Sequence, residues 1–544
     1  MRGVERKIGK WTRGTFIFCA FALLFVLYLS TINPELSDLS GDSARFLLLA
    51  KSLASGKGYS EIEKPDQPLH TEYMPGLPIL LAPIYRFHPQ SLKPMKFLMV
   101  VFAFGSCVFF FLFLRPEPVS ARVFLAGAFG LIPFLLRLQT QILSDFPHLA
   151  FLLLAFLWFE KSREKTEQKI RDWVIAGFLM ALAFYFRQLA IIAFASGILA
   201  LILSKNLRRA KVLLGYPLGF LLPAAIWYLR NFLAGGAIEP SYGKKLWFAR
   251  ASDPFAGTLT VAGLIERTMR RIGFFSWRLE KEILIGADGK IFTALWIMLL
   301  VLLLIGLGYE LIRRKNISAI YFLPYLMAVA CWEGWVPRYL LPLLPLSIFF
   351  IYRGLELVIT GIGKNKNSSK AIAAAVIGLW LIFNFSRSIS VIIFQHTPII
   401  YPRTSAVEEA EARALLGEKN FAFYPEAWEW RKKGEKYLLL KSGAYYHFFA
   451  MAEWAKRNLK PEAVVVCRKP TLFAGQSRMK SIQFPAELEV DKFITEAKKR
   501  GGEYLVLEEI SPELRPILFG FWKSRPERLA LEKQISQTYL LRIN

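Results

Sequence analysis

Runs of 15 to 22 mostly apolar residues follow one another through the first 395 residues, separated by charged segments. A bilayer core about 30 Å thick needs about 20 apolar residues in a spanning helix, and fewer where the helix is tilted or sheltered. The pattern therefore predicts eleven membrane-spanning helices, and because several runs are short, a count of ten to thirteen fits the sequence. The predicted spans are residues 15–32, 97–114, 122–136, 146–160, 173–187, 189–204, 212–229, 291–312, 317–332, 339–353 and 371–390.

The last quarter of the chain has the pattern of an ordinary soluble domain. Helical periodicity alternates there with short apolar runs, which is typical of a small α/β domain. The predicted helices are residues 448–459 and 488–500, and the predicted strands are 462–467 and 503–507. We therefore expect a membrane domain over residues 1–395 and an α/β domain over residues 396–544.

Basic residues gather in every second connection between the predicted spans. Cytoplasmic connections are enriched in Lys and Arg, so this alternation predicts a cytoplasmic N-terminus. The predicted cytoplasmic segments are 1–14, 115–121, 161–172, 205–211, 313–316 and 354–370. The first apolar run lacks a small-residue cleavage pattern and is interpreted as a retained span. Eleven spans then place the loops 33–95 and 230–290 and the C-terminal domain outside, in a multi-pass protein of the inner (plasma) membrane.

Composition agrees with this division. The chain is 54% apolar and 20% charged, with a mean hydropathy of +0.36, whereas soluble domains are about 45–50% apolar and about 25% charged. These values exclude a single soluble globule and a disordered chain. The cysteines, Cys19, Cys107, Cys331 and Cys467, form no CxxC pair and indicate neither a disulfide framework nor a zinc site.

The net charge of +27 belongs mainly to the membrane domain. Residues 396–544 hold 25 basic and 19 acidic residues, a net +6, so +21 lies among the predicted spans. Basic residues between spans determine topology. The charge therefore predicts contacts with membrane lipids and no nucleic-acid partner.

Two acids stand at the predicted outer face. Asp42 precedes a predicted short helix over residues 43–54, and Asp145 lies at the outer end of the fourth span. Either acid can act simply as a helix cap. An acid at a membrane boundary that faces a polar cavity is often functional, because burial without a partner is unfavourable. His148 is interpreted as a packed or capping histidine.

Three arginines, Arg187, Arg230 and Arg338, lie on the outer face, where the positive-inside rule depletes cations. Each can simply extend toward lipid headgroups. A planar guanidinium group also suits phosphate recognition, so anion binding is the alternative.

Two further outer segments are predicted to lie at the membrane surface. Residues 79–87 are apolar but too short to span, and residues 260–282 are amphipathic and basic. The second segment is interpreted as a surface helix. The alternative is that Arg267, Arg270 and Arg271 gather an anionic lipid substrate.

Short motifs on the outer face follow one another in a characteristic order. The first three are Gly41-Asp42-Ser43-Ala44-Arg45-Phe46, Tyr73-Met74-Pro75-Gly76-Leu77-Pro78 and Leu143-Ser144-Asp145. The next are Phe186-Arg187, Trp227-Tyr228-Leu229-Arg230-Asn231 and Arg338-Tyr339-Leu340-Leu341-Pro342-Leu343-Leu344-Pro345. In order and placement they resemble the GT-C glycosyltransferases, nearest to the protein-mannosyltransferase and aminoarabinose-transferase-like group, over most of residues 15–395.

The resemblance implies a GT-C-like membrane fold and a glycosyltransferase. Such an enzyme moves a sugar from a polyprenyl-phosphate carrier to an extracytoplasmic acceptor, which is a lipid, a glycan or a protein. It implies Asp42 as the base and Asp145 as a second acid near the acceptor or a metal. The implied substrate-binding residues are Arg187, Arg338, Tyr339, Glu72, Tyr73 and Arg230, of which Arg187 and Arg338 are expected to contact phosphate.

The sequence assigns no cofactor. Members of the resembled family often carry an acidic pair or Asp-x-Asp, whereas Ser43 follows Asp42 here and Asp38 lies four residues earlier. A divalent metal, Mg²⁺ or Mn²⁺, held by Asp42 and Asp145 therefore stays open as an alternative to arginine.

Two other classes of function share the many spans. A transporter or lipid-linked sugar flippase usually places ionisable residues near midmembrane or shows two similar halves. Here the acids lie in outer loops, and the sequence has no evident half-to-half repeat. A non-catalytic scaffold with an outer binding domain would need neither Asp42 nor Asp145, so the glycosyltransferase is preferred.

Overall fold

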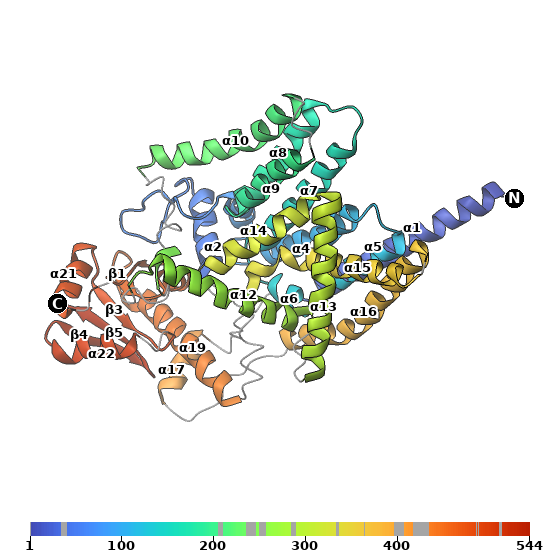
Figure 1. Cartoon of the computed structure of the whole chain (residues 1–544). Coiled ribbons are helices and arrows are strands. Elements are labelled where there is room, and N and C mark those ends of the chain that lie inside the picture. Colours follow the sequence, from blue (N-terminus) through green and yellow to red (C-terminus); the bar gives the residue numbers. More distant parts are fainter. Residues whose placement is uncertain are drawn as a thin grey trace.

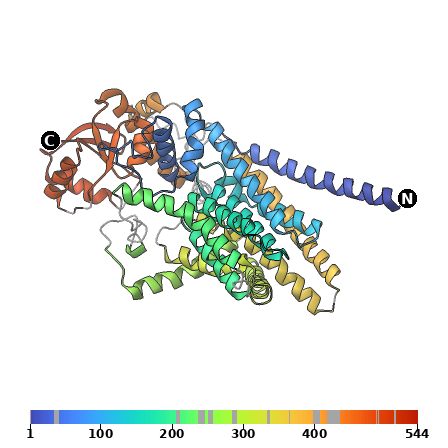
Figure 2. The same ribbon diagram turned by 90° about the horizontal axis from the view of Figure 1, so that it is seen from above.

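The structure is a computed structural model of the 544-residue chain. It describes residues 2–33, 41–204, 210–235, 246–249, 257–283, 290–332, 337–363, 365–396, 407–416, 435–485, 487, 489–510 and 514–544. A helical domain and a smaller α/β domain lie beside each other (Figures 1 and 2). The start of helix α1 (Arg2–Leu29) lies at the end of the molecule far from the α/β domain.

A helix corresponds to each predicted span. These helices are α1, α4 (Lys93–Phe113), α5 (Val119–Gly130), α6 (Pro133–Leu138), α7 (Asp145–Glu164), α8 (Ile170–Phe186), α9 (Ala190–Leu203), α10 (Ala210–Leu233), α13 (Lys290–Tyr309), α14 (Ile317–Cys331), α15 (Leu343–Gly361) and α16 (Lys366–His396). A π-helical turn, η2 (Glu310–Arg314), continues α13.

Two predicted spans have the wrong bounds, and proline is the reason in both. The predicted span 122–136 is divided between α5 and α6, because Pro133 cannot donate a hydrogen bond to the preceding turn. The predicted span 339–353 begins later, at Leu343, because a 3₁₀ helix, η3 (Pro337–Leu340), and then Pro342 precede it.

The helical domain is that of a polytopic membrane protein. Among the described residues, five helices are long and apolar enough to cross a bilayer by length and composition. Shorter apolar helices coincide with four more predicted spans, at 14–29, 119–130, 190–203 and 317–331. The total of eleven spans stays a prediction.

Three helices belong to the predicted outer loops: α2 (Gly41–Ala54), α3 (Gly76–Phe87) and α12 (Val261–Ile283). Helix α12 is amphipathic as predicted, and its apolar residues Val261, Ile265 and Met269, one turn apart, are exposed as expected for a helix that meets lipid.

The other face of α12 packs against α14. Arg267 donates a hydrogen bond to the carbonyl of Phe248 (2.8 Å), and Arg271 donates to the carbonyl of Trp332. Arg270 is exposed. Two of the three arginines thus bind the protein's own backbone, and the alternative in which all three gather an anionic lipid stays a prediction.

The C-terminal domain contains a five-stranded mixed sheet. Its strands are β1 (Val464–Cys467), β2 (Lys480–Gln483), β3 (Tyr504–Leu507), β4 (Leu529–Ile535) and β5 (Thr538–Ile543), and its helices are α17 (Val407–Leu416), α19 (Glu435–Asn458), α20 (Pro470–Ser477), α21 (Val490–Lys499) and α22 (Arg515–Ser524). The strand order is β2-β1-β3-β5-β4, parallel across β2, β1 and β3 and antiparallel beyond. The predicted α/β alternation is confirmed, and the β4–β5 hairpin was not predicted.

The first outer loop attaches to the edge of this sheet. The backbone N–H of Ser481 in β2 donates to the carbonyl of Glu63 (2.8 Å), and the Lys480 ammonium donates to the carbonyl of Ile62 (2.7 Å). Ala44 of α2 lies in the core beneath α19 and α20. The first outer loop and the C-terminal domain therefore lie on one face of the membrane, as predicted from the alternation of charge.

Several of the predicted cytoplasmic segments meet at the opposite end of the bundle. Arg163 donates to the carbonyl of Lys315 (2.7 Å), and the Lys315 ammonium donates to the carbonyl of Leu203 (2.7 Å). Arg115 pairs with Glu164. The two sets of connections are thus segregated, and the identity of the cytoplasmic face stays a prediction.

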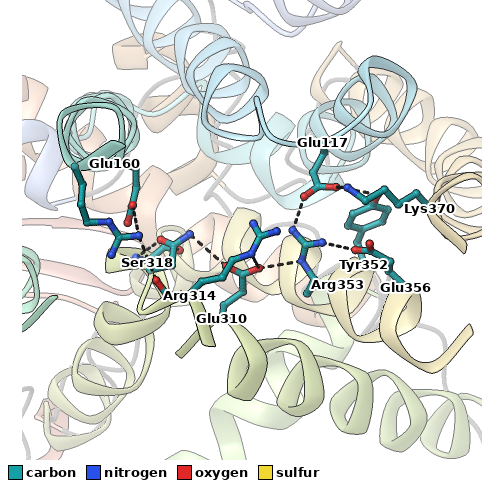
Figure 3. Close-up of polar contacts among 11 residues, drawn as sticks. Glu117, Glu160, Glu310, Arg314, Ser318, Tyr352, Arg353, Glu356 and Lys370 are labelled. Carbon is teal, nitrogen blue, oxygen red and sulfur yellow. Dashed lines mark hydrogen bonds and ion pairs between the residues drawn. The ribbon is translucent and has the colours of Figure 1, made fainter. Parts of the chain in front are cut away.

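A buried charge cluster fastens this end (Figure 3). Arg353 of α15 donates through Nε to Glu310 (2.9 Å) and through its Nη atoms to two further carboxylates, Glu117 and Glu356. The Lys370 ammonium also donates to Glu117 (2.5 Å). One guanidinium group therefore joins the segment before α5, η2 and α15, and Glu117 connects them to α16 through Lys370.

The cluster depends on close contact between α13 and α15. A β-carbon at Gly306 would overlap the carbonyl of Phe350, and one at Gly354 would overlap the carbonyl of Leu302. Because neither glycine has a side chain, the helices approach closely enough to bring Glu310, one turn beyond Gly306, beside Arg353.

Replacing Arg353 by Leu is expected to destabilise the protein strongly. Removal of one partner of a buried ion pair costs about 3–5 kcal/mol, because the remaining carboxylates are left unpaired. The melting temperature in detergent should fall by several degrees, whereas Arg313→Leu, an exposed position on η2, should leave it nearly unchanged. Equal melting temperatures for the two variants would contradict a fastening role for the cluster.

Candidate active site

A cavity of about 190 Å³ lies at the end of the bundle that faces the C-terminal domain. It is lined by Asp42, Phe46, Glu72, Tyr73, Met74, Ser144, Phe186, Arg187, Gln188, Leu189, Ala328, Val329, Trp332, Arg338 and Tyr339. Six of the eight site residues predicted from the sequence are in this lining. Because these six residues come from four separate segments of the chain, only the folded membrane domain assembles them.

Asp42 is presented to the cavity by the first turn of α2. It is the second residue of the helix rather than its N-cap, so the simpler interpretation of this acid is wrong. Its carboxylate accepts a hydrogen bond from the Tyr73 hydroxyl (2.6 Å) and pairs with the Arg338 guanidinium group. All three side chains are thus directed to one point.

The charge state of Asp42 results from opposing influences. Burial raises the pKa of the carboxyl, but the positive charge of Arg338 and the hydrogen bond from Tyr73 lower the pKa by more. The pKa of Asp42 is therefore below its ordinary value, and the side chain is an anion at neutral pH.

Asp145 lies deeper, at the first residue of α7, with 1% of its side chain exposed. One carboxylate oxygen is 3.0 Å from Nη2 of Arg187, and the other is 3.7 Å from Nη1 of Arg338. The capping interpretation does not account for these contacts. Arg338 is consequently shared between Asp42 and Asp145, so the two predicted acids are joined through one cation.

Tyr339 forms part of the wall beside the two arginines. The Arg187 guanidinium carbon is 5.0 Å from the centre of the Tyr339 ring, within the range of a cation–π interaction. The Tyr325 hydroxyl of α14 donates to the Tyr339 carbonyl (2.9 Å) and thereby holds η3 against α14. The ring therefore helps to orient the guanidinium group that faces the cavity.

Much of the rest of the lining is apolar. Phe46, Phe186, Leu189, Val329 and Trp332 line the cavity together with the charged residues. A cavity lined by both guanidinium groups and apolar side chains suits an amphiphilic anion.

Arg230 has a different environment from the other predicted residues. Its guanidinium group donates to the carbonyls of His70 and Tyr59 (3.1 Å for Tyr59) and lies 5.4 Å from the Trp227 ring centre. It is absent from the cavity lining. The structure therefore connects Arg230 to the loop before α3 rather than to the space around Asp42.

His148 is packed, as predicted from the sequence. It is fully buried in α7, and its Nδ1 lies 3.1 Å from the carbonyl oxygen of Ala183. The residue thus links α7 to α8 and does not line the cavity.

The two acids do not form a metal-binding set. Among the residues that the structure describes, no group of three or more His, Cys, Asp or Glu side chains could hold a metal ion. Asp42 and Asp145 instead each contact a guanidinium group. This donor set does not fit Mg²⁺ or Mn²⁺, and Asp38, the other acid considered, lies outside the described residues.

Two residues beside the site were not predicted from the sequence. His70 Nε2 accepts a hydrogen bond from the backbone N–H of Tyr73 (2.7 Å), and Nδ1 lies 2.8 Å from Glu61. Both occur in a loop without helical or strand periodicity, so no pattern marked them. Only the nearness of His70 to the motif that begins at Tyr73 could have drawn attention to it.

Part of the helical domain is similar in sequence to a known family. Residues 90–228 match the family model described as dolichyl-phosphate-mannose-protein mannosyltransferase. This match covers α4 to most of α10 and includes Asp145 and Arg187. A search of curated proteins found no match by sequence.

Solved structures resemble the chain over nearly its whole length. The crystal structure of ArnT from Cupriavidus metallidurans bound to undecaprenyl phosphate is 11% identical, with a TM-score of 0.54, over 97% of this chain and 98% of that chain. The apo form of the same protein is 12% identical, with a TM-score of 0.51, over the same shares of both chains. The Archaeoglobus fulgidus oligosaccharyltransferase tethered with an acceptor peptide is 13% identical, with a TM-score of 0.51, over 91% of this chain and 69% of that chain. At these identities the likeness concerns the fold, which includes the C-terminal domain.

Proposed function

We propose that this chain, a member of the GT-C superfamily, is a membrane glycosyltransferase that moves a sugar from a polyprenyl-phosphate carrier to an extracytoplasmic acceptor. The observation that carries the proposal is the cavity in which the Asp42 carboxylate, two guanidinium groups and an apolar wall meet. The undecaprenyl phosphate bound to ArnT supports a polyprenyl-phosphate donor here.

The donor is an amphiphile, and the cavity offers a surface for each of its parts. The phosphate would bind between Arg187 and Arg338, the lipid chain would follow the apolar wall that includes Trp332, and the sugar would lie toward Asp42 and Glu72. Guanidinium groups bind phosphate through paired hydrogen bonds. Proximity to the membrane allows the lipid chain to stay in the bilayer.

In the proposed reaction, a hydroxyl oxygen of the acceptor attacks the anomeric carbon, and the bond from that carbon to the phosphate oxygen breaks. The hydroxyl proton passes to the Asp42 carboxylate, which must lie within hydrogen-bond reach. The bonding electrons leave with the polyprenyl phosphate, whose additional negative charge is stabilised by Arg187 and Arg338.

The pair between Asp42 and Arg338 suggests how the base becomes active. While Arg338 contacts Asp42, its charge lowers the pKa of the carboxyl. A bound phosphate would draw the guanidinium group toward itself, and burial would then raise the pKa of Asp42. The carboxylate would thus become a stronger base when the donor is in place.

The test uses purified protein in lipid, radiolabelled polyprenyl-phosphate sugars and a membrane extract as a source of acceptors. Label in a new product with the wild-type protein, and none with an Asp42→Asn variant, is the expected result. No transfer with any sugar would count against the proposal and favour a transporter or flippase, which a flux assay in vesicles would then detect.

A further inference from the structure

We propose that His70 is the positioning residue of this site: it fixes Tyr73, and through Tyr73 the Asp42 carboxylate, only while its imidazole ring is neutral. The proposal rests on the proposed transferase function for its effect on activity, and on the hydrogen bonds of the first outer loop for its structural part. His70 does not line the cavity and does not touch Asp42.

The hydrogen bonds around the ring define its tautomer. A backbone N–H can only donate, so Nε2 of His70 must accept from Tyr73 (2.7 Å) and carries no proton. The proton therefore resides on Nδ1 and is donated to the carboxylate of Glu61 (2.8 Å). This arrangement needs the neutral ring, because a protonated imidazole has no acceptor atom.

The hydrogen bond between His70 and Tyr73 affects the position of a group that contacts Asp42. The residue whose backbone His70 holds is the same residue whose hydroxyl donates to Asp42 (2.6 Å). The Tyr73 ring also lies against Phe46, with ring centres 5.4 Å apart, so its direction is constrained on both sides. Loss of the contact at the backbone of Tyr73 would consequently move the hydroxyl that orients the proposed base.

The surroundings of His70 hold it in place. It is 1% exposed, its carbonyl accepts from Arg230, and its ring packs edge-on to Tyr59 with centres 5.5 Å apart. Arg230 thus helps to hold the loop that contains His70. A residue this enclosed responds to protonation by breaking its hydrogen bonds rather than by turning into solvent.

The charged groups that face the ring are Glu61, Arg45 and Glu72. Burial has the largest effect and lowers the pKa of His70, and the positive charge of Arg45 lowers it further. The negative charges of Glu61 and Glu72 raise it, but the net result is a pKa below the ordinary value. Glu61 itself pairs with Arg45 (3.4 Å) and Lys64 (2.5 Å), and its pKa is lowered to about 2, so it remains an acceptor.

The sign of the pH effect follows from these charges. With its pKa lowered by burial, His70 is neutral at pH 7 and becomes protonated only as the pH falls below its ordinary pKa. Transfer should therefore decrease on the acid side through that titration. Titration of Asp42 is a separate source of acid loss and would persist in His70→Gln, whereas the loss caused by His70 would not. A polyprenyl-phosphate sugar is a phosphodiester without a titration in this range.

The first measurement does not depend on activity. The chain has five histidines, so the nitrogen and carbon NMR signals of labelled histidine in nanodiscs can be assigned by comparison with His70→Gln. A neutral His70 with the proton on Nδ1 at pH 7 is expected. A proton on Nε2, or a charged ring at pH 7, would overturn the proposal.

The second measurement follows kcat and KM for the donor against pH. His70→Gln retains an acceptor for the Tyr73 N–H but does not titrate, so kcat near neutral pH should stay close to wild type while the acid decrease caused by His70 disappears. His70→Phe removes the acceptor and should lower kcat by about 10–100-fold at every pH, with a smaller change in KM. His88→Gln, at an exposed position in the same outer loop, is the matched control.

An acid decrease that persists unchanged in His70→Gln would refute the positioning role. If the wild-type protein transfers no sugar at all, the proposed function fails instead, and the tautomer measurement alone decides the assignment of His70. The two failures are therefore distinguishable.

Discussion

Asp42→Asn should abolish sugar transfer, with kcat reduced by at least about 10²–10⁴-fold, the range for loss of a general base. Asparagine has nearly the same volume and keeps an oxygen that can accept from the Tyr73 hydroxyl, but it cannot take the acceptor's proton. Initial rates with a radiolabelled donor measure the effect. The variant should insert into the membrane and melt within a few degrees of wild type.

The matched control is Asp66→Asn. Asp66 is exposed in the same outer loop, and its replacement removes the same charge. Full activity in the control together with none in Asp42→Asn would assign the effect to the carboxylate in the cavity. Activity like that of the wild type in Asp42→Asn would remove Asp42 from the mechanism.

Arg338→Gln should lower kcat/KM for the donor by about 10²–10³-fold, the range found when one donor to a developing negative charge is removed. Arg338 is the cation shared by Asp42 and Asp145, so its loss also leaves Asp42 without this ion pair, whereas Asp145 keeps Arg187. Binding of undecaprenyl phosphate to the purified protein should weaken in parallel. Arg338→Lys should be intermediate, because an ammonium group keeps the charge but not the two-sided contact.

This substitution also has a distinct pH signature. Without the guanidinium group, burial is the main remaining influence and the pKa of Asp42 should rise. The activity that remains in Arg338→Gln should therefore decrease at a higher pH on the acid side than in the wild type. Arg86→Gln, at an exposed position on α3, is the control. Unchanged donor binding in Arg338→Gln would contradict phosphate recognition by this residue.

The sequence was sufficient to predict the charged residues in and beside the cavity. Asp42, Asp145, Arg187 and Arg338 all stand at ends of apolar runs on one predicted face, and the ends of packed spanning helices on one face are close together in space. Arg230 carried the same signal but faces the loop before α3. The path of that loop determines the contacts of Arg230, and the loop sequence has no helical or strand periodicity from which its path could be predicted.

Other features were hidden for different physical reasons. Glu117 and Arg353 form an ion pair although they are 236 residues apart in the sequence. Both lie in or beside basic segments that the sequence predicts to be ordinary connections between spans. The β4–β5 hairpin turns at Ser536, which adopts a positive φ of 49° without being glycine, so the usual Asn-Gly or Gly signal is absent. The tertiary structure, rather than local propensity, determines both.

The attachment of the first outer loop to strand β2 has a consequence for biosynthesis. The residues joined by this contact, Ile62 and Lys480, are 418 positions apart. At a synthesis rate of about 5–20 residues per second, roughly 20–80 s pass before the ribosome makes the second partner. We therefore expect the loop that carries His70 and Tyr73 to reach its final arrangement only after the C-terminal domain has been synthesised and folded. A chain already inserted in the membrane but without strand β2 would thus lack the partner to which this loop is attached.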